Sequence, residues 1–217
     1  MARVALIDCG IAGSPTGAAQ AFAPDGRACP TVPPRVGHGS ALAKVILHQA
    51  PGAVLLDAQV FTDAPATSAT AVAAAIDWAV AQGAAVINLS LGLPHDRPAL
   101  AQACANAAEA GVLLIASSPA RGGPVFPASY PRVLRVCGDA RCGPGEFSAL
   151  GTAQADVGAC VFAPDARHGD ADRSGASYAT AYVSGRLAAL LDEAPGGRDA
   201  LRRLIEECRW KGPERRV

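Results

Sequence analysis

The chain has 217 residues, of which 50% are hydrophobic, enough to bury one substantial core. Its 19 basic and 19 acidic residues balance, which argues against nucleic acid as a partner. No uninterrupted apolar run reaches the roughly 18 residues of a membrane-spanning helix. We expect one compact domain, residues 1–217, with neither nucleic-acid nor membrane partners.

The first predicted strand is the apolar run 3–7, which Asp8 ends and Gly10 follows. This pattern is typical of an aspartate at the carboxyl end of a buried strand. The strand begins too close to Met1 for a secretion signal with its charged and apolar regions. We therefore expect a cytoplasmic protein that is translated in its mature form, without a propeptide.

The middle of the chain alternates strands and helices. His38 stands between Gly37 and Gly39, before a helix-like run at 41–47. Strands are predicted at 53–60, 85–89, 112–116 and 133–137, and helices at 68–82 and 98–110. This succession indicates an α/β fold with parallel strands, in which catalytic groups lie at the carboxyl ends of the strands.

Ser177 follows Gly175 and begins an apolar helical run at 178–191. Alone, Asp8, His38 and Ser177 have ordinary explanations as a strand-end cap, a turn histidine and a helix N-cap. Together they supply the three groups that activate a serine: a nucleophile, an imidazole that takes its proton, and a carboxylate that orients the imidazole. Their chain order and glycine-rich surroundings favour nucleophilic catalysis.

All three segments resemble those of the subtilases, the subtilisin-like serine endopeptidases, and the resemblance covers nearly the whole chain. It extends to segments 86–92, 111–117 and 126–131. It implies a three-layer α/β fold, a mainly parallel sheet with helices on both faces. It also implies that Ser177 attacks the peptide bond, His38 moves the proton and Asp8 orients His38.

The same resemblance assigns a pocket for one substrate side chain. One wall is formed by Ser90, Leu91 and Gly92, the opposite wall by Ala116, Ser117 and Ser118, and the base by Val125. Because Val125 is branched and uncharged, we expect a small or medium apolar residue on the acyl side of the cut bond.

One departure from the family lies beside this pocket. The asparagine that normally donates to the oxyanion is absent from the run Ser117-Ser118-Pro119-Ala120-Arg121. Loss of this donor slows subtilisin by roughly a hundredfold to a thousandfold. The alternatives are a hydroxyl of Ser117 or Ser118, Arg121, or a backbone N–H of residues 118–123, and Ser118 is favoured as the nearest. The family role of Asn88 is structural.

We expect no cofactor and no metal. The short connection 50–52 leaves no room for the family's calcium loop, and Asp57 and Asp63 are expected to be solvated or ion-paired. The seven cysteines are expected to be reduced, with Cys9 a buried, inert thiol.

Three further histidines, His48, His95 and His168, are predicted to lie on the surface. The tail 198–217 is predicted to pack as a helix whose apolar face comprises Leu201, Leu204, Ile205 and Cys208.

Two classes of function fit these observations. The first is an intracellular endopeptidase that cuts a specific peptide or protein, removing a leader peptide within a maturation complex. In its general build, the chain resembles the protease that matures a subunit of quinohemoprotein amine dehydrogenase. The second is a degenerate subtilase that binds peptides with little or no activity.

Overall fold

The computed structural model describes residues 1–13, 17–61, 66–164, 174–194 and 196–213. The strands are β1 (Arg3–Asp8), β2 (Ala19–Phe22), β3 (Ala28–Cys29), β4 (Val54–Gln59), β5 (Val86–Leu89), β6 (Leu113–Ser117), β7 (Val133–Gly138), β8 (Phe147–Ala149), β9 (Val157–Ala159) and β10 (Trp210–Lys211). The helices are α1 (His38–Gln49), α2 (Ala69–Ala81), α3 (Pro98–Glu109), α4 (Ala176–Glu193) and α5 (Gly197–Glu207). The strands form one sheet in the order β10-β8-β9-β7-β6-β5-β1-β4-β2-β3.

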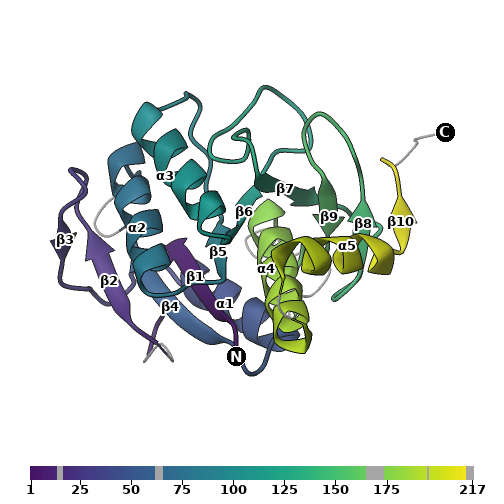
Figure 1. The fold of residues 1–217 in the computed structure, drawn as a ribbon, viewed down its shortest axis with the longest axis horizontal. Coiled ribbons are helices and arrows are strands. Elements are labelled where there is room, and N and C mark those ends of the chain that lie inside the picture. Colours follow the sequence, from purple (N-terminus) through teal and green to yellow (C-terminus); the bar gives the residue numbers. More distant parts are fainter. Residues whose placement is uncertain (14–16, 62–65, 165–173, 195, 214–217) are drawn as a thin grey trace.

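The centre of the sheet is parallel, and the strand order reverses at β1. This strand pairs with β4 on one side and with β5 on the other. From β1 the chain passes through the edge strands β2 and β3 and then through α1 to β4. It continues through α2 to β5, on the opposite side of β1 (Figure 1). In open parallel sheets, ligands bind at the carboxyl ends of the strands where the order reverses. Asp8 is the last residue of β1.

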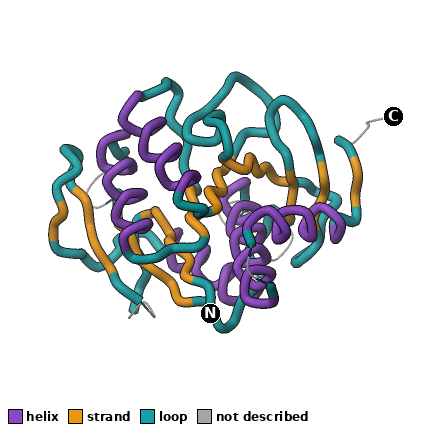
Figure 2. The backbone as a smooth tube through the Cα atoms, viewed as in Figure 1, coloured by secondary structure: helices purple, strands orange, loops and turns teal. Residues whose placement is uncertain are grey.

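Helices cover both faces of the sheet, so the predicted three-layer α/β fold is confirmed (Figure 2). Helices α1, α4 and α5 pack on one face, and α2 and α3 pack on the other. Successive side chains of a strand point to opposite faces. Leu6 accordingly belongs to the core beneath α1 and α4, and Ile7 to the core beneath α2 and α3. None of the helices in the described ranges is both long and apolar enough to cross a bilayer.

The predicted tail helix is present as α5, but Ile205 does not belong to its buried apolar face as predicted. Its buried stripe runs through Ala200, Leu204 and Cys208, whereas Ile205 is 39% exposed. With 3.6 residues per turn, adjacent residues project about 100° apart around a helix. Ile205 is therefore turned away from the stripe that Leu204 helps to form.

Candidate active site

Asp8 and His38 form a direct hydrogen-bonded pair. Asp8 is only 3% exposed, and its Oδ1 accepts the N–H of Cys9 at 2.8 Å. The Nδ1 atom of His38 lies 2.9 Å and 3.0 Å from the two carboxylate oxygens. Because an ionised carboxylate only accepts, Nδ1 carries the hydrogen and Nε2 keeps a lone pair on the other side of the ring. A general base needs this tautomer.

His38 reaches Asp8 because α1 approaches the end of β1 closely. The helix begins at His38, three residues earlier than the predicted run, so His38 lies in its first turn. A Cβ atom on Gly39 would lie 2.4 Å from the carbonyl oxygen of Gly10 and 3.3 Å from Oδ1 of Asp8. Only glycine permits this approach. The His38 side chain remains 35% exposed, which leaves part of the ring open to a substrate.

The pair changes the acid–base behaviour of His38. The hydrogen bond from His38 to Asp8 raises the pKa of the imidazole above its ordinary 6.5, and the charge of Asp8 adds to this effect. Burial opposes it by penalising the charged ring. The cationic form of the imidazole is therefore more stable than in an isolated histidine.

Cys9 fastens the turn after Asp8 to the start of α1. Its thiol donates to the carbonyl of Val36 at 3.3 Å and accepts the N–H of Gly39 at 3.4 Å. Burial, and then the charge of Asp8, raise the pKa of the thiol to about 11. Cys9 is half-buried rather than fully buried, but its thiol stays protonated near neutral pH and is inert as a nucleophile.

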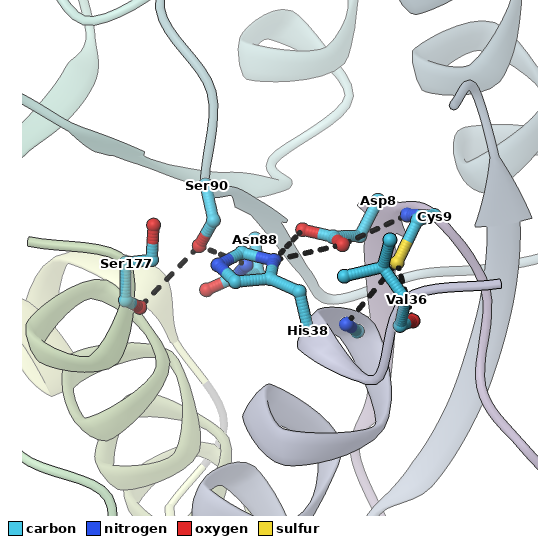
Figure 3. Close-up of polar contacts among 8 residues, drawn as sticks. Asp8, Cys9, Val36, His38, Asn88, Ser90 and Ser177 are labelled. Carbon is cyan, nitrogen blue, oxygen red and sulfur yellow. Dashed lines mark hydrogen bonds and ion pairs between the residues drawn. The ribbon is translucent and has the colours of Figure 1, made fainter. Parts of the chain in front are cut away.

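Ser177 lies in the first turn of α4, on the side of the His38 ring opposite Asp8 (Figure 3). The helix begins after Gly175, whose φ of +136° favours glycine. The ring of Tyr178 meets that of His38 edge to face, with centroids 6.5 Å apart. The helix N-terminus directs backbone N–H groups and a partial positive charge toward this region, where an oxyanion would be stabilised.

The segments predicted to line the substrate pocket lie against one another. The backbones of Leu93 and Phe126 exchange two hydrogen bonds, of 2.7 Å and 2.9 Å. This bridge brings Gly92 beside Val125, and a Cβ on Gly92 would lie 3.4 Å from the Cβ of Val125. On the opposite side, the Ser117 hydroxyl lies 3.5 Å from the carbonyl oxygen of Leu91.

The structure does not favour Ser118 as an oxyanion donor. Its side chain is buried, and its hydroxyl donates to the carbonyl of Gln154 at 2.6 Å. Its N–H donates to the carbonyl of Val136 at 2.7 Å. Both hydrogens are thus held by other segments of the protein. Ser117, Arg121 and the backbone N–H groups after residue 118 are the other sources named from the sequence.

The interpretation of Asp57 as a solvated or ion-paired residue is wrong. Asp57 is 2% exposed, and its Oδ2 accepts the N–H of Ile11 and the side-chain amide of Gln59, both at 3.1 Å. Burial raises the pKa of Asp57, and the charge of Asp8 adds to the rise. The carboxyl holds the loop that follows Asp8, which is a structural role.

Predictions from the sequence also cover three other histidines and one other aspartate. His48 and His95 are exposed, as predicted, whereas Asp63 and His168 lie outside the described residues. Among the described residues, no group of three or more histidine, cysteine or acidic side chains is placed to hold a metal ion.

The interactions of Asn88 could not be predicted from the local sequence. Its side-chain amide, fully buried in β5, donates to Ser90 and accepts from Ser184. Ser184 lies within the helical run 178–191, but its partner on β5 lies 96 residues away along the chain.

Comparisons with known proteins find one family over most of the chain. The profile of the Subtilase family matches residues 18–207. Subtilisin Savinase of Lederbergia lenta is 30% identical over 207 residues, which cover 89% of this chain and 77% of that protein. The structure of the prenylagaramide maturation protease PagA is similar at a TM-score of 0.62 and 25% identity, covering 88% of this chain and 75% of that one. The fold also matches the epidermin leader peptide processing serine protease EpiP of Staphylococcus aureus, with a TM-score of 0.70, 19% identity, and coverage of 94% and 68%.

Proposed function

The chain belongs to the subtilase family of serine endopeptidases, and from this premise we propose that Asp8, His38 and Ser177 are its catalytic triad. The observation that carries the proposal is the pair of contacts, 2.9 Å and 3.0 Å, between Nδ1 of His38 and the carboxylate of Asp8. These contacts leave Nε2 as the basic atom, and Ser177 lies on the opposite side of the ring from Asp8 (Figure 3).

The reaction follows from these positions. Oγ of Ser177 attacks the carbonyl carbon of the scissile bond while Nε2 of His38 takes the hydroxyl proton. The proton then passes to the leaving amine, and a water molecule hydrolyses the acyl-enzyme by the same route. Asp8 stabilises the imidazolium at each step. The backbone N–H of Ser177 supplies one donor to the oxyanion.

We propose that the substrate is one specific precursor, from which the enzyme removes a leader peptide. The name of PagA, a relative at 25% identity, is that of a maturation protease. The Ser118 hydroxyl donates to the carbonyl of Gln154 and is therefore not available to the oxyanion. With this donor missing, we expect slow turnover that depends on a tightly bound substrate. All seven cysteines are free thiols, which supports a reducing compartment such as the cytoplasm.

A cleavage survey tests this proposal. A library of proteome-derived peptides is incubated with the parent enzyme or with Ser177→Ala, and the new termini are sequenced. The parent is expected to cut few sequences, with a small apolar residue on the acyl side, and Ser177→Ala none. Cleavage at many unrelated sites would contradict a dedicated protease, and a parent that cuts nothing would favour the peptide-binding alternative.

A further inference from the structure

A buried amide lies on the face of the sheet beneath α4. Asn88 pairs with Leu6 of β1 and Ile115 of β6, and both neighbours belong to the apolar core between the sheet and α4. The Asn88 side chain is fully buried. An amide in such surroundings is costly unless its polar atoms are hydrogen-bonded.

The polar atoms of Asn88 connect two points on α4. The Ser184 hydroxyl, which is also fully buried, donates to Oδ1 of Asn88 at 3.0 Å. Nδ2 of Asn88 donates to Oγ of Ser90 at 3.0 Å. The Ser90 hydroxyl then donates to the carbonyl oxygen of Ser177 at 3.4 Å. Figure 3 shows the last two steps of this chain of hydrogen bonds.

The chain has a direction, because a hydroxyl has a single hydrogen to donate. Since Ser90 accepts from the amide of Asn88, its own hydrogen is free to reach Ser177. With the amide reversed, Oδ1 would face Ser90 and take that hydrogen, and Ser177 would lose its donor. Ser184 holds the productive orientation by donating to Oδ1.

Ser177 and Ser184 lie on one face of α4. They are seven residues apart, which is about two turns or 10 Å along a helix. Holding the Ser177 carbonyl restricts the rotation of its backbone and therefore the direction of its Cα–Cβ bond. The same link ties Ser177 to Ser90, in the segment assigned to the pocket wall.

We propose that Ser184 is a positioning residue for Ser177, acting through Asn88 and Ser90, an inference that rests on the proposed function. Ser184 touches neither the substrate nor the reacting atoms. It sets the orientation of the serine relative to His38 and to the bound peptide.

The test uses an alkyl fluorophosphonate, which reacts with an activated serine and needs no knowledge of the substrate. Its reaction rate is measured for the parent, Ser184→Ala, Ser90→Ala and the double variant. Each single variant is expected to react about threefold to tenfold more slowly, the range of a lost hydrogen bond. The double variant is expected to react no more slowly than Ser90→Ala, because both changes break one chain.

Thr180→Val is the matched control. Thr180 is another fully buried hydroxyl on α4, but it donates within the helix to the carbonyl of Ala176 at 2.8 Å. This variant is expected to react at the parent rate. Thermal unfolding of every variant is recorded, and Ser184→Cys, which keeps a weak donor, replaces Ser184→Ala if the latter is unfolded.

The outcomes separate the inference from the function beneath it. If the parent is not labelled, or if Ser177→Ala is labelled as strongly as the parent, the proposed function and this inference are both overturned. A labelled parent whose Ser184→Ala variant reacts at the parent rate overturns the inference alone. So does a double variant in which the two losses multiply.

Discussion

Replacing Val125 by glycine is expected to shift the preferred residue on the acyl side of the cut bond from small to large. The three side-chain carbons of Val125 lie 3.4, 3.6 and 3.8 Å from the position that a Cβ would take on Gly92. Val125 therefore fills the space beside this wall. Each buried methylene contributes about 0.8 kcal/mol, so filling the vacated space with substrate carbons gives about 2 kcal/mol, or about 30-fold in specificity.

Two peptides that differ only in having alanine or phenylalanine at that position measure this shift. The ratio of their kcat/KM values is determined for the parent, Val125→Ala and Val125→Gly. The phenylalanine-to-alanine ratio is expected to rise in that order, with Val125→Ala intermediate as the internal control. A ratio unchanged across the series, or a parent that prefers the phenylalanine peptide, would refute the assignment of Val125 to the base of the pocket.

The other predictions concern His38, Ser118 and Asp57. Because Asp8 raises the pKa of His38 and the base must be neutral, kcat/KM should fall on acidification with a limb above pH 6.5; a limb at or below that value would contradict the pairing. Ser118→Ala should leave the single-turnover rate unchanged while lowering stability by about 1 kcal/mol, since its hydroxyl serves Gln154. A tenfold slower turnover would restore Ser118 as an oxyanion donor. Burial raises the pKa of Asp57 in the folded protein above its value in the unfolded chain. The stability that depends on this group is therefore fully present below the unfolded pKa and is lost as the pH rises through the folded pKa. Asp57→Asn should therefore raise Tm more at pH 8 than at pH 4. An equal change at the two pH values, or a larger rise at pH 4, would show that burial of the charge is not the cause.

The residue pattern predicts that Asp8 ends a buried strand, and the resemblance to the subtilases pairs it with His38. An apolar run that ends in aspartate places that residue at the carboxyl edge of a parallel sheet. The glycines around His38 allow the next helix to approach that edge closely. The short strands at the sheet margins were missed, since segments such as β3 (Ala28–Cys29) and β10 (Trp210–Lys211) are too short to show a period.

Other features depend on contacts between distant segments. The sequence predicts Asp57 as solvated or ion-paired, but it is buried and accepts the N–H of Ile11, 46 residues earlier in the chain. The local sequence does not indicate that the Ser118 hydroxyl donates to the carbonyl of Gln154, which lies 36 residues later in the chain. Local periodicity carries no information about either contact.

Fluorophosphonate labelling followed by peptide mapping decides whether Ser177 is an activated nucleophile. The proposed triad predicts a single adduct on Ser177 in the parent. The adduct should be absent from Ser177→Ala and nearly absent from His38→Ala, whose folds are checked by thermal unfolding. An adduct on another serine, or equal labelling of the parent and His38→Ala, would contradict the proposed triad.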